Sequence, residues 1–209
     1  MSVEILPSGA SAVLVQVDTA EEVAALDAAL GPADLPGVRE WVPAARTVLV
    51  LFDGRHTSAD FVGAAVRRLA ASAPAGPAPA PGPLVDIPVA YDGADLAAVA
   101  GHLRIGIEEV IARHTSTLWR VAFVGFAPGF PYLVGAGTDL RVPRHRQPRV
   151  SVPAGSVALA DEYCGIYPRV SPGGWQLIGV TTSTVWDPTR ADPALLTPGT
   201  RVRFVVAGQ

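Results

Sequence analysis

A run rich in alternating alanine and proline, from Ala70 to Pro83, constrains this chain more than any other feature. Proline has no backbone N–H and fixes φ, so such a run cannot continue a helix and favours extended polyproline geometry. Semi-rigid segments of this kind act as spacers between domains. We therefore predict a linker over residues 73–83, between a small domain of residues 1–72 and a larger domain of residues 84–209.

The composition excludes several classes of protein. The chain is 49% hydrophobic and 17% charged, which allows a core, and its net charge of −3 does not fit a nucleic-acid binder. No apolar run approaches the roughly 20 residues that span a bilayer. The single cysteine, Cys164, cannot form an internal disulfide, and residues 1–10 show no basic, apolar leader. We expect a soluble, cytoplasmic protein without a membrane or nucleic-acid partner.

Arginine supplies all 16 basic residues, because the sequence contains no lysine. A phosphate-loop lysine and a lysine Schiff base are therefore excluded. Anion binding then depends on backbone N–H groups or on arginine, whose planar guanidinium binds a carboxylate or phosphate through two hydrogen bonds. The histidines and the cysteine do not show the spacing of a metal site, and we predict no metal in this chain.

Residues 1–72 show a βαββα pattern. Asp18 or Thr19 is positioned to cap the first helix, and Thr57 or Ser58 the second. This order of elements predicts a small α+β domain of ferredoxin-like type. The predicted elements are strands at 12–17 (to which 4–6 is a candidate addition), 38–42 and 47–52, and helices at 20–30 and from the second cap to about residue 70.

Residues 84–209 begin with a strand at 84–90 and two amphipathic helices, at 94–103 and 107–114. The rest is a series of short strands separated by glycine and proline, without a long helix. This pattern is typical of a closed barrel or a sandwich, and by itself it does not choose between them. The predicted strands are 119–124, 157–159, 175–181 and 200–206.

The segment from Gly125 to Leu133 reads GFAPGFPYL and combines turn residues with aromatic ones. Pro128–Gly129 is a turn dipeptide, and Pro131 restricts Phe130 to extended conformations. A rigid loop with aromatic side chains suits the wall of a ligand pocket, and it also suits a hydrophobic turn that plugs the end of a barrel. Phe130 and Tyr132 are the candidate substrate-binding residues of this segment.

Four arginines lie within nine residues, from Arg141 to Arg149. Pro143–Arg144 and Pro148–Arg149 repeat a dipeptide in which proline fixes the backbone before the arginine and lowers the entropic cost of positioning it. Such a cluster suits a carboxylate, a phosphate or an acidic partner, and it equally suits a solvated loop. We predict that at least one of Arg144 and Arg149 is functional and that Arg141 and Arg146 are solvated.

Two further turns and one histidine complete the set of candidates. Ser156 is not in the Gly-x-Ser-x-Gly pattern of a serine nucleophile, so we interpret it as a turn residue or a ligand contact. Trp175 is interpreted as a core anchor. His114 ends a predicted helix, where the helix dipole alone favours a histidine. The remaining candidate ligand contacts are Tyr167 and Ser171, which have polar tips, and Gly173 and Gly174, which permit close backbone approach.

Taken together, these motifs resemble the family of 5-oxoprolinase B subunits, also called allophanate hydrolase subunit 1 or the KipI family. The ordered series is far more specific than any single motif, and the resemblance covers nearly the whole chain. The motifs that carry it are His114-Thr115, Gly125 to Leu133, Pro143-Arg144, Pro148-Arg149, Pro153 to Val157, Gly165 to Pro168 and Ser171 to Trp175.

The resemblance implies a cyclophilin-like β-barrel in residues 84–209. It also implies a complex with two other 5-oxoprolinase proteins: the C subunit, of the allophanate hydrolase subunit 2 family, and the A subunit, of the LamB/YcsF family. That complex would use ATP, bound by the complex, to hydrolyse the small cyclic amide 5-oxo-L-proline to L-glutamate. Within it, Arg144 and His114 would be catalytic, with His114 as acid or base. The residues expected to bind substrate are Phe130, Tyr132, Arg149, Ser156, Tyr167, Ser171, Gly173 and Gly174.

Two positions depart from the pattern expected of the family. Val180 stands where an arginine is common, and the acidic pair Asp161-Glu162 precedes Gly165 in place of a glycine-rich turn. Substrate identity is therefore less constrained than fold, and two other functions stay open. One is a KipI-like inhibitor that binds a sensor histidine kinase. The other is a carboxyltransferase-type subunit of a biotin-dependent carboxylase that acts on urea or a similar amide.

Overall fold

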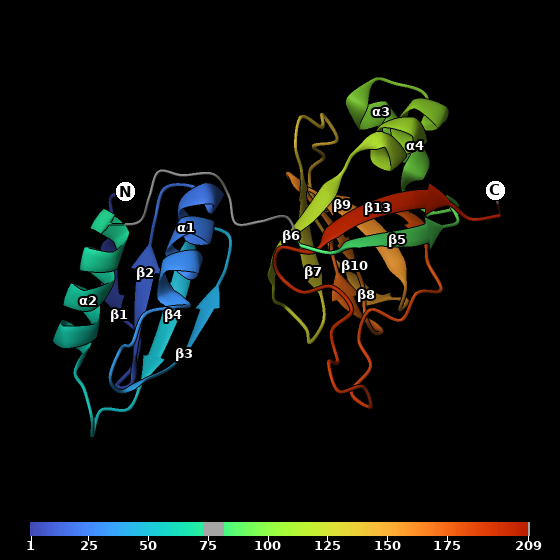
Figure 1. Cartoon of the computed structure of the whole chain (residues 1–209). Helices are drawn as coiled ribbons and strands as arrows, with labels where there is room; N and C mark the ends of the chain where they lie inside the picture. Colours follow the sequence, from blue (N-terminus) through green and yellow to red (C-terminus); the bar gives the residue numbers. More distant parts are fainter. Residues whose placement is uncertain (73–81, 209) are drawn as a thin grey trace. The chain divides into compact units, whose positions relative to one another are not determined.

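The computed structural model describes residues 1–72 and 82–208. The chain divides into two compact units, Met1–Ala80 and Pro81–Gln209, and each is described by itself (Figure 1). Residues 73–81 of the predicted linker lie outside the described residues, so its extended conformation stays a prediction. The domain boundaries placed at residues 72 and 84 stay a proposal.

The first unit is a four-stranded antiparallel sheet with two helices packed on it (Figure 1). Its strand order is β1-β2-β4-β3. Side chains alternate along β2 and β4, and Val13, Val15, Val48 and Val50 are buried because they face the helices. The elements are β1 (Glu4–Pro7), β2 (Ala12–Gln16), α1 (Ala20–Leu30), β3 (Val38–Pro43), β4 (Thr47–Phe52) and α2 (Ala59–Ser72).

Both helices of this unit begin where the predicted caps place them. The Thr19 hydroxyl accepts a hydrogen bond from the Glu22 N–H at 3.2 Å, and the Ser58 hydroxyl accepts one from the Phe61 N–H at 3.3 Å. The order of elements differs from the prediction at its start. Residues Glu4–Pro7 form a separate strand, which pairs antiparallel with β2 and becomes the outer strand of the sheet. A ferredoxin-like class is not confirmed for this unit.

The second unit is built around a seven-stranded sheet of order β12-β9-β10-β7-β6-β13-β5. A two-stranded arm, β8–β11, pairs separately, with Gly173 opposite Arg149. The elements are β5 (Leu84–Val89), α3 (Leu96–Leu103), α4 (Ile107–Ser116), β6 (Trp119–Val124), β7 (Pro131–Gly135), β8 (Arg149–Val152), β9 (Ser156–Ala160), β10 (Tyr163–Ile166), β11 (Ser171–Gly173), β12 (Gln176–Val180) and β13 (Arg201–Val206).

The sheet curls into a nearly closed barrel because its two edges meet where β5 ends. Ala90 and Val180 exchange two backbone hydrogen bonds of 2.9 Å, and the Gly93 N–H donates to the Ile178 carbonyl at 3.3 Å. A Cβ at Gly93 would overlap the Ile178 carbonyl carbon and lie 2.5 Å from the Gly179 nitrogen. Only glycine therefore lets this loop lie on β12. The predicted mainly-β barrel is confirmed, whereas its cyclophilin-like class stays a prediction.

Helices α3 and α4 lie together at one end of the barrel (Figure 1). Their buried residues Val99 and Val110 join the main core, which also contains Trp119, Phe204 and Cys164. Among the helices of residues 1–72 and 82–208, none is both long and apolar enough to span a membrane.

Candidate functional site

An aromatic cluster lies on the opposite face of the barrel wall from the main core. Successive side chains of a strand point to opposite faces, so Cys164 of β10 faces the main core and Tyr163 faces the cluster. A register shift between Val121 and Phe123 in β6 turns Phe123 to this same face, where its ring stacks on Tyr132 with centroids 4.3 Å apart. The cluster is therefore a second small core outside the barrel interior.

The loop between β6 and β7 covers this cluster with Phe130. Phe130 is 1% exposed, and its ring centroid lies 5.2 Å from that of Tyr132, 5.1 Å from Tyr167 and 5.3 Å from Trp175. Phe126 of the same loop has a left-handed φ of 66° and is 60% exposed. Left-handed backbone is strained for an aromatic residue, and such strain gathers at functional sites. Phe130 is thus a packing residue here, whereas Tyr132 is only half-buried.

Arg144 is the accessible cation of this cluster. Its Cζ lies 5.7 Å from the centroid of the Trp175 ring, and its Nε donates to Asp161 Oδ2 at 3.1 Å. The two side chains of that ion pair are 51% and 45% exposed, so the pair is weak and can exchange for another anion. Burial raises the pKa of Tyr132 and the charge of Arg144 lowers it, which places the phenol within electrostatic reach of the guanidinium. Together these groups suit a small planar anion.

Arg149 borders the same cluster from the β8–β11 arm. Its Nη2 donates to Asp95 Oδ1 at 2.6 Å and its Nη1 to the Trp175 carbonyl at 3.5 Å. Burial raises the pKa of Tyr167, and both Arg144 and Arg149 act to lower it. The predicted contacts Tyr167 and Gly173 also meet here, because a Cβ at Gly173 would overlap the Tyr167 hydroxyl. Tyr167 is itself 1% exposed.

The remaining predicted ligand contacts have structural partners. Ser156 of β9 is buried, and its carbonyl accepts a hydrogen bond from the Tyr167 N–H at 2.9 Å. The Ser171 hydroxyl donates to the Arg169 carbonyl at 3.4 Å. The Gly174 carbonyl accepts from the His145 N–H at 2.7 Å, which holds the loop that carries Arg144 against β12. These contacts shape the backbone around the aromatic cluster.

The structure does not bring His114 together with Arg144. His114 is fully buried in the main core, where its Nδ1 lies 2.7 Å from the Tyr91 hydroxyl and its Nε2 lies 3.3 Å from the Cys164 sulfur. Its ring also packs on Phe204, with centroids 4.3 Å apart. Because Cys164 points away from the aromatic cluster, the barrel wall separates the two predicted catalytic residues. The acid–base role predicted for His114 has no support in this geometry.

Sequence reasoning missed Asp95. This carboxylate is 6% exposed and lies among Arg149, His145 and the backbone of Leu177, which are 50 to 82 residues away along the chain. An aspartate just before a helix ordinarily indicates a helix cap, so its pattern in the sequence conceals the long-range contacts. Trp175 is 5% exposed and packs on Phe130 and Tyr132, so it is the core anchor that the sequence predicted.

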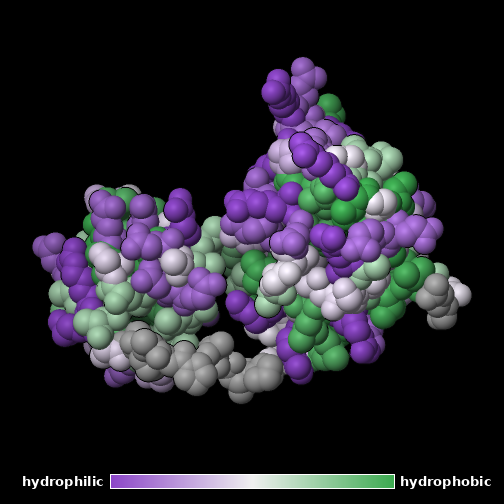
Figure 2. Space-filling view, turned by 90° about the horizontal axis from the view of Figure 1, so that it is seen from above, coloured by the Kyte–Doolittle hydropathy of each residue, from purple (hydrophilic) through white to green (hydrophobic). Residues whose placement is uncertain are grey.

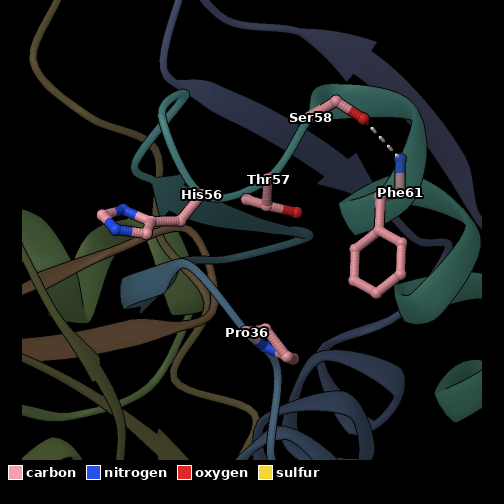
Figure 3. A pocket seen from close by; sticks show the side chains of 5 residues that line it. All are labelled: Pro36, His56, Thr57, Ser58 and Phe61. Carbon is pink, nitrogen blue, oxygen red and sulfur yellow. Dashed lines mark hydrogen bonds between the residues drawn. The ribbon is translucent and has the colours of Figure 1, made fainter.

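Two open pockets lie elsewhere. One, of about 310 Å³, is in the first unit, where Pro36 and Phe61 line it together with the short polar segment that precedes α2 (Figure 3). The other, of about 450 Å³, is lined by residues between Trp186 and Thr197 of the barrel unit. Neither contains a predicted site residue. Within residues 1–72 and 82–208, no group of three or more His, Cys, Asp and Glu side chains is placed to hold a metal ion.

Apolar side chains also reach the surface near this site. Figure 2 shows hydrophobic residues at the surface of the barrel unit in several separate patches. Large exposed examples include Val150 of β8, at 92%, and Val170 just before β11, at 63%. Both belong to or adjoin the β8–β11 arm that carries Arg149. Single exposed apolar residues are common on protein surfaces, so these two valines do not by themselves indicate a contact surface.

The sequence matches one family model, described as the carboxyltransferase domain, subdomain C and D, over residues 3–196. It is 48% identical over 124 residues to the B subunit of 5-oxoprolinase from Escherichia coli O157:H7, covering 58% of this chain and 57% of that protein. It is 46% identical over 125 residues to the protein of the same name from Bacillus subtilis (strain 168), covering 58% and 52%. The chain thus spans somewhat more than half the length of these relatives.

Solved structures show the same fold. A conserved uncharacterized protein of Pyrococcus horikoshii is 32% identical, with 97% of each chain covered and a TM-score of 0.57. The structure of TTHA0988 is 40% identical with a TM-score of 0.78, and it covers 95% of this chain but 40% of its own. The Kluyveromyces lactis urea amidolyase, at 19% identity and a TM-score of 0.81, covers 98% of this chain and 15% of its own, and it shows the fold alone.

The family match extends over almost the whole chain, and the curated relatives carry the name that the sequence motifs predicted. The chain belongs to the carboxyltransferase subdomain C and D family, and the curated relatives that it resembles are B subunits of 5-oxoprolinase.

Proposed function

We propose that this chain is one component of an ATP-dependent 5-oxoprolinase complex, which hydrolyses 5-oxo-L-proline to L-glutamate in the cytoplasm. The relatives named as 5-oxoprolinase B subunits, at 44% identity or more, support the proposal. The partners would be the C subunit, of the allophanate hydrolase subunit 2 family, and the A subunit, of the LamB/YcsF family. ATP would be bound by the assembled complex, since this chain has no lysine for a phosphate loop.

The observation that carries the proposal is the position of Arg144 over Trp175, whose ring centroid lies 5.4 Å from that of Tyr132. The substrate 5-oxoproline is a flat lactam ring that bears one carboxylate. A guanidinium binds the carboxylate through charge-assisted hydrogen bonds, and the half-buried Tyr132 and the exposed Phe126 offer aromatic surface to the ring. The half-exposed Asp161 occupies the guanidinium in the absence of such an anion.

The site offers binding groups rather than a complete catalytic set. His114, the residue predicted as acid or base, lies behind the barrel wall and is fully buried. Burial raises the pKa of Tyr132 and of Tyr167, which keeps both phenols protonated at neutral pH and able to donate hydrogen bonds. The general base and the ATP-binding groups would then come from a partner protein, which agrees with a chain that acts only in a complex.

Removing the Arg144 charge is expected to weaken binding of 5-oxoproline. Hydrogen bonds to charged groups contribute about 1.5–3 kcal/mol, so Arg144→Gln should raise the KM of the reconstituted three-protein complex by roughly 10- to 100-fold. Arg141→Gln is the matched control, because Arg141 lies in the same loop and pairs with the exposed Glu162 at 3.4 Å. The measurement is glutamate formation that depends on both 5-oxoproline and ATP.

The three outcomes separate the possible roles. Activity that requires this chain and falls only in Arg144→Gln supports the proposal. Activity that requires this chain but is equal in both variants places substrate binding elsewhere. An assembled complex without any 5-oxoprolinase activity would contradict the proposed substrate.

A second candidate, a carboxyltransferase-type subunit of a biotin-dependent amide or urea carboxylase, is favoured by the family description and by the fold shared with urea amidolyase. Any biotin would be carried by another protein, because this chain has no lysine to which it could be attached. A second assay distinguishes the two functions: with ATP, bicarbonate, a biotin carboxylase and its biotinylated carrier protein added, carboxylation of urea without glutamate formation from 5-oxoproline would select this one.

A further inference from the structure

Asp95 is a buried carboxylate that organises one side of the aromatic cluster. Its side chain is 8% exposed. Its Oδ1 accepts a hydrogen bond from Arg149 Nη2 at 2.6 Å, and its Oδ2 accepts one from the Leu177 N–H at 2.7 Å. The His145 Nε2 lies 3.2 Å from the same Oδ2, although not aligned as a hydrogen bond. One carboxylate therefore joins α3, β12, the arginine-rich loop and the β8–β11 arm.

The Asp95 side chain does not form the helix-capping hydrogen bond that its position before α3 allows. Asp95 occupies the N-cap position of α3, where an aspartate ordinarily accepts a hydrogen bond from the first turn of the helix. Its side chain makes no such bond. Burial raises the pKa of Asp95, but the hydrogen bonds from Arg149 and Leu177 outweigh this and leave the pKa below its usual range. The carboxylate is therefore charged at neutral pH and committed to Arg149.

The ion pair with Asp95 limits the ability of Arg149 to bind an incoming anion. Arg149 is 30% exposed and is held on two sides, by Asp95 and by the Trp175 carbonyl. A guanidinium paired with a buried carboxylate contributes little net charge to an incoming anion. Arg144, by contrast, forms its ion pair with the exposed and exchangeable Asp161. Arg144 and Arg149 look equivalent in the sequence, where each follows a proline, but they differ in how freely they can bind a ligand.

We propose that Asp95 is a positioning residue: it fixes Arg149 as a support for Trp175 and Tyr167, and it leaves Arg144 as the arginine that binds the ligand. This assignment replaces the predicted substrate-binding role of Arg149. Its functional part rests on the proposed function above, because the ligand is taken to be 5-oxoproline. Its structural part concerns this chain alone.

The structural part is tested by the reaction rates of individual arginines with phenylglyoxal, an arginine-selective reagent, followed by peptide mass spectrometry. In the unmodified sequence, Arg149 should react more slowly than Arg144. In Asp95→Asn, Arg149 should react about tenfold faster, because a neutral amide holds the guanidinium far less tightly. Asp161→Asn is the matched control: it removes the partner of Arg144 and should leave the Arg149 rate unchanged.

The functional part is tested by a double-mutant cycle in the reconstituted complex. Asp95→Asn should raise the KM for 5-oxoproline by about fivefold or more, with a smaller change in kcat. In an Arg149→Gln background the same substitution should change KM by less than about twofold, because Asp95 acts through Arg149. A general loss of structure would instead give additive effects on KM in the two backgrounds.

The results that overturn the proposal are equally specific. If Arg149 reacts as fast as Arg144 in the unmodified sequence, or at an unchanged rate in folded Asp95→Asn, Asp95 does not fix Arg149. If Asp95→Asn does not fold, an Arg149 rate equal to that of Arg144 in the unmodified sequence still overturns the proposal. A complex without any activity on 5-oxoproline would refute the proposed substrate, while the labelling rates would still decide the role of Asp95.

Discussion

Gly93→Ala is expected to lower the free energy of unfolding of the barrel unit by about 3 kcal/mol, at the upper end for the insertion of a single methyl group. The added Cβ would overlap the backbone of β12 at Ile178, where no side-chain rotation can relieve the clash. The loop would have to move away from β12, which would break the Gly93 hydrogen bond and strain the Ala90–Val180 pairing that closes the barrel. Urea unfolding, followed by tryptophan fluorescence, measures the change.

Gly101→Ala is the matched control, because Gly101 lies in α3 of the same unit and a Cβ there would meet nothing within 4 Å. Alanine is favoured over glycine in a helix by about 1 kcal/mol, so this variant should be slightly more stable than the unmodified protein. Three of the four tryptophans (Trp119, Trp175 and Trp186) lie in the barrel unit and report its unfolding. Equal stability of the two variants would mean that the barrel does not close as described.

The elements that follow from local sequence signals were predictable. The first helix was expected at 20–30 and runs from Ala20 to Leu30, because a threonine cap and a Gly-Pro stop define both of its ends. The strand at 119–124 was also predicted, from the β-branched and aromatic residues between two turns. The β8–β11 arm was not predicted. It is short and rich in glycine and proline, and its pairing depends on contacts that no local pattern encodes.

The candidate site was predictable in its residue types but not in its geometry. The sequence identified Arg144, Arg149 and the aromatic loop, and the structure places them around one cluster. The sequence could not show that Arg149 is paired with a carboxylate, since its partner Asp95 lies 54 residues earlier. A local signal did exist for the burial of His114: it follows Val110 by four residues and so lies on the apolar face of α4, beside Ile111. The helix-dipole argument concealed that signal.

The buried position of His114 makes the stability of the barrel unit depend on pH. Burial lowers the pKa of His114 to about 3, whereas an exposed histidine in the unfolded chain has a pKa near 6.5. The unfolded state therefore binds a proton at a higher pH than the folded state does. The contribution of this group is fully present above about pH 6.5 and is lost as the pH falls from there towards about 3. Within that window the loss is about 1.4 kcal/mol per pH unit.

The neighbours of His114 indicate which form the fold requires. Burial raises the pKa of Tyr91, so its hydroxyl keeps its proton and forms a hydrogen bond of 2.7 Å with Nδ1 of the neutral His114 ring. Its Nε2 pairs with the Cys164 sulfur at 3.3 Å. A second ring proton would place a charge against Phe204 and Trp119 that neither Tyr91 nor Cys164 compensates, because burial raises the pKa of both groups and keeps them neutral. Acid therefore favours the unfolded state, in which His114 is exposed to water and binds its proton at a higher pH.

His114→Gln is expected to flatten the dependence of stability on pH between about 6.5 and 4.5, because glutamine hydrogen-bonds without titrating. The measurement is the free energy of unfolding from urea titrations at four or five pH values, and the slope rather than the absolute stability is compared. His102→Gln is the control: its side chain is exposed on α3, so it should keep the slope of the unmodified protein. If His114→Gln retains that slope, another group governs acid unfolding, and protonation of His114 does not determine how the stability of the barrel unit depends on pH.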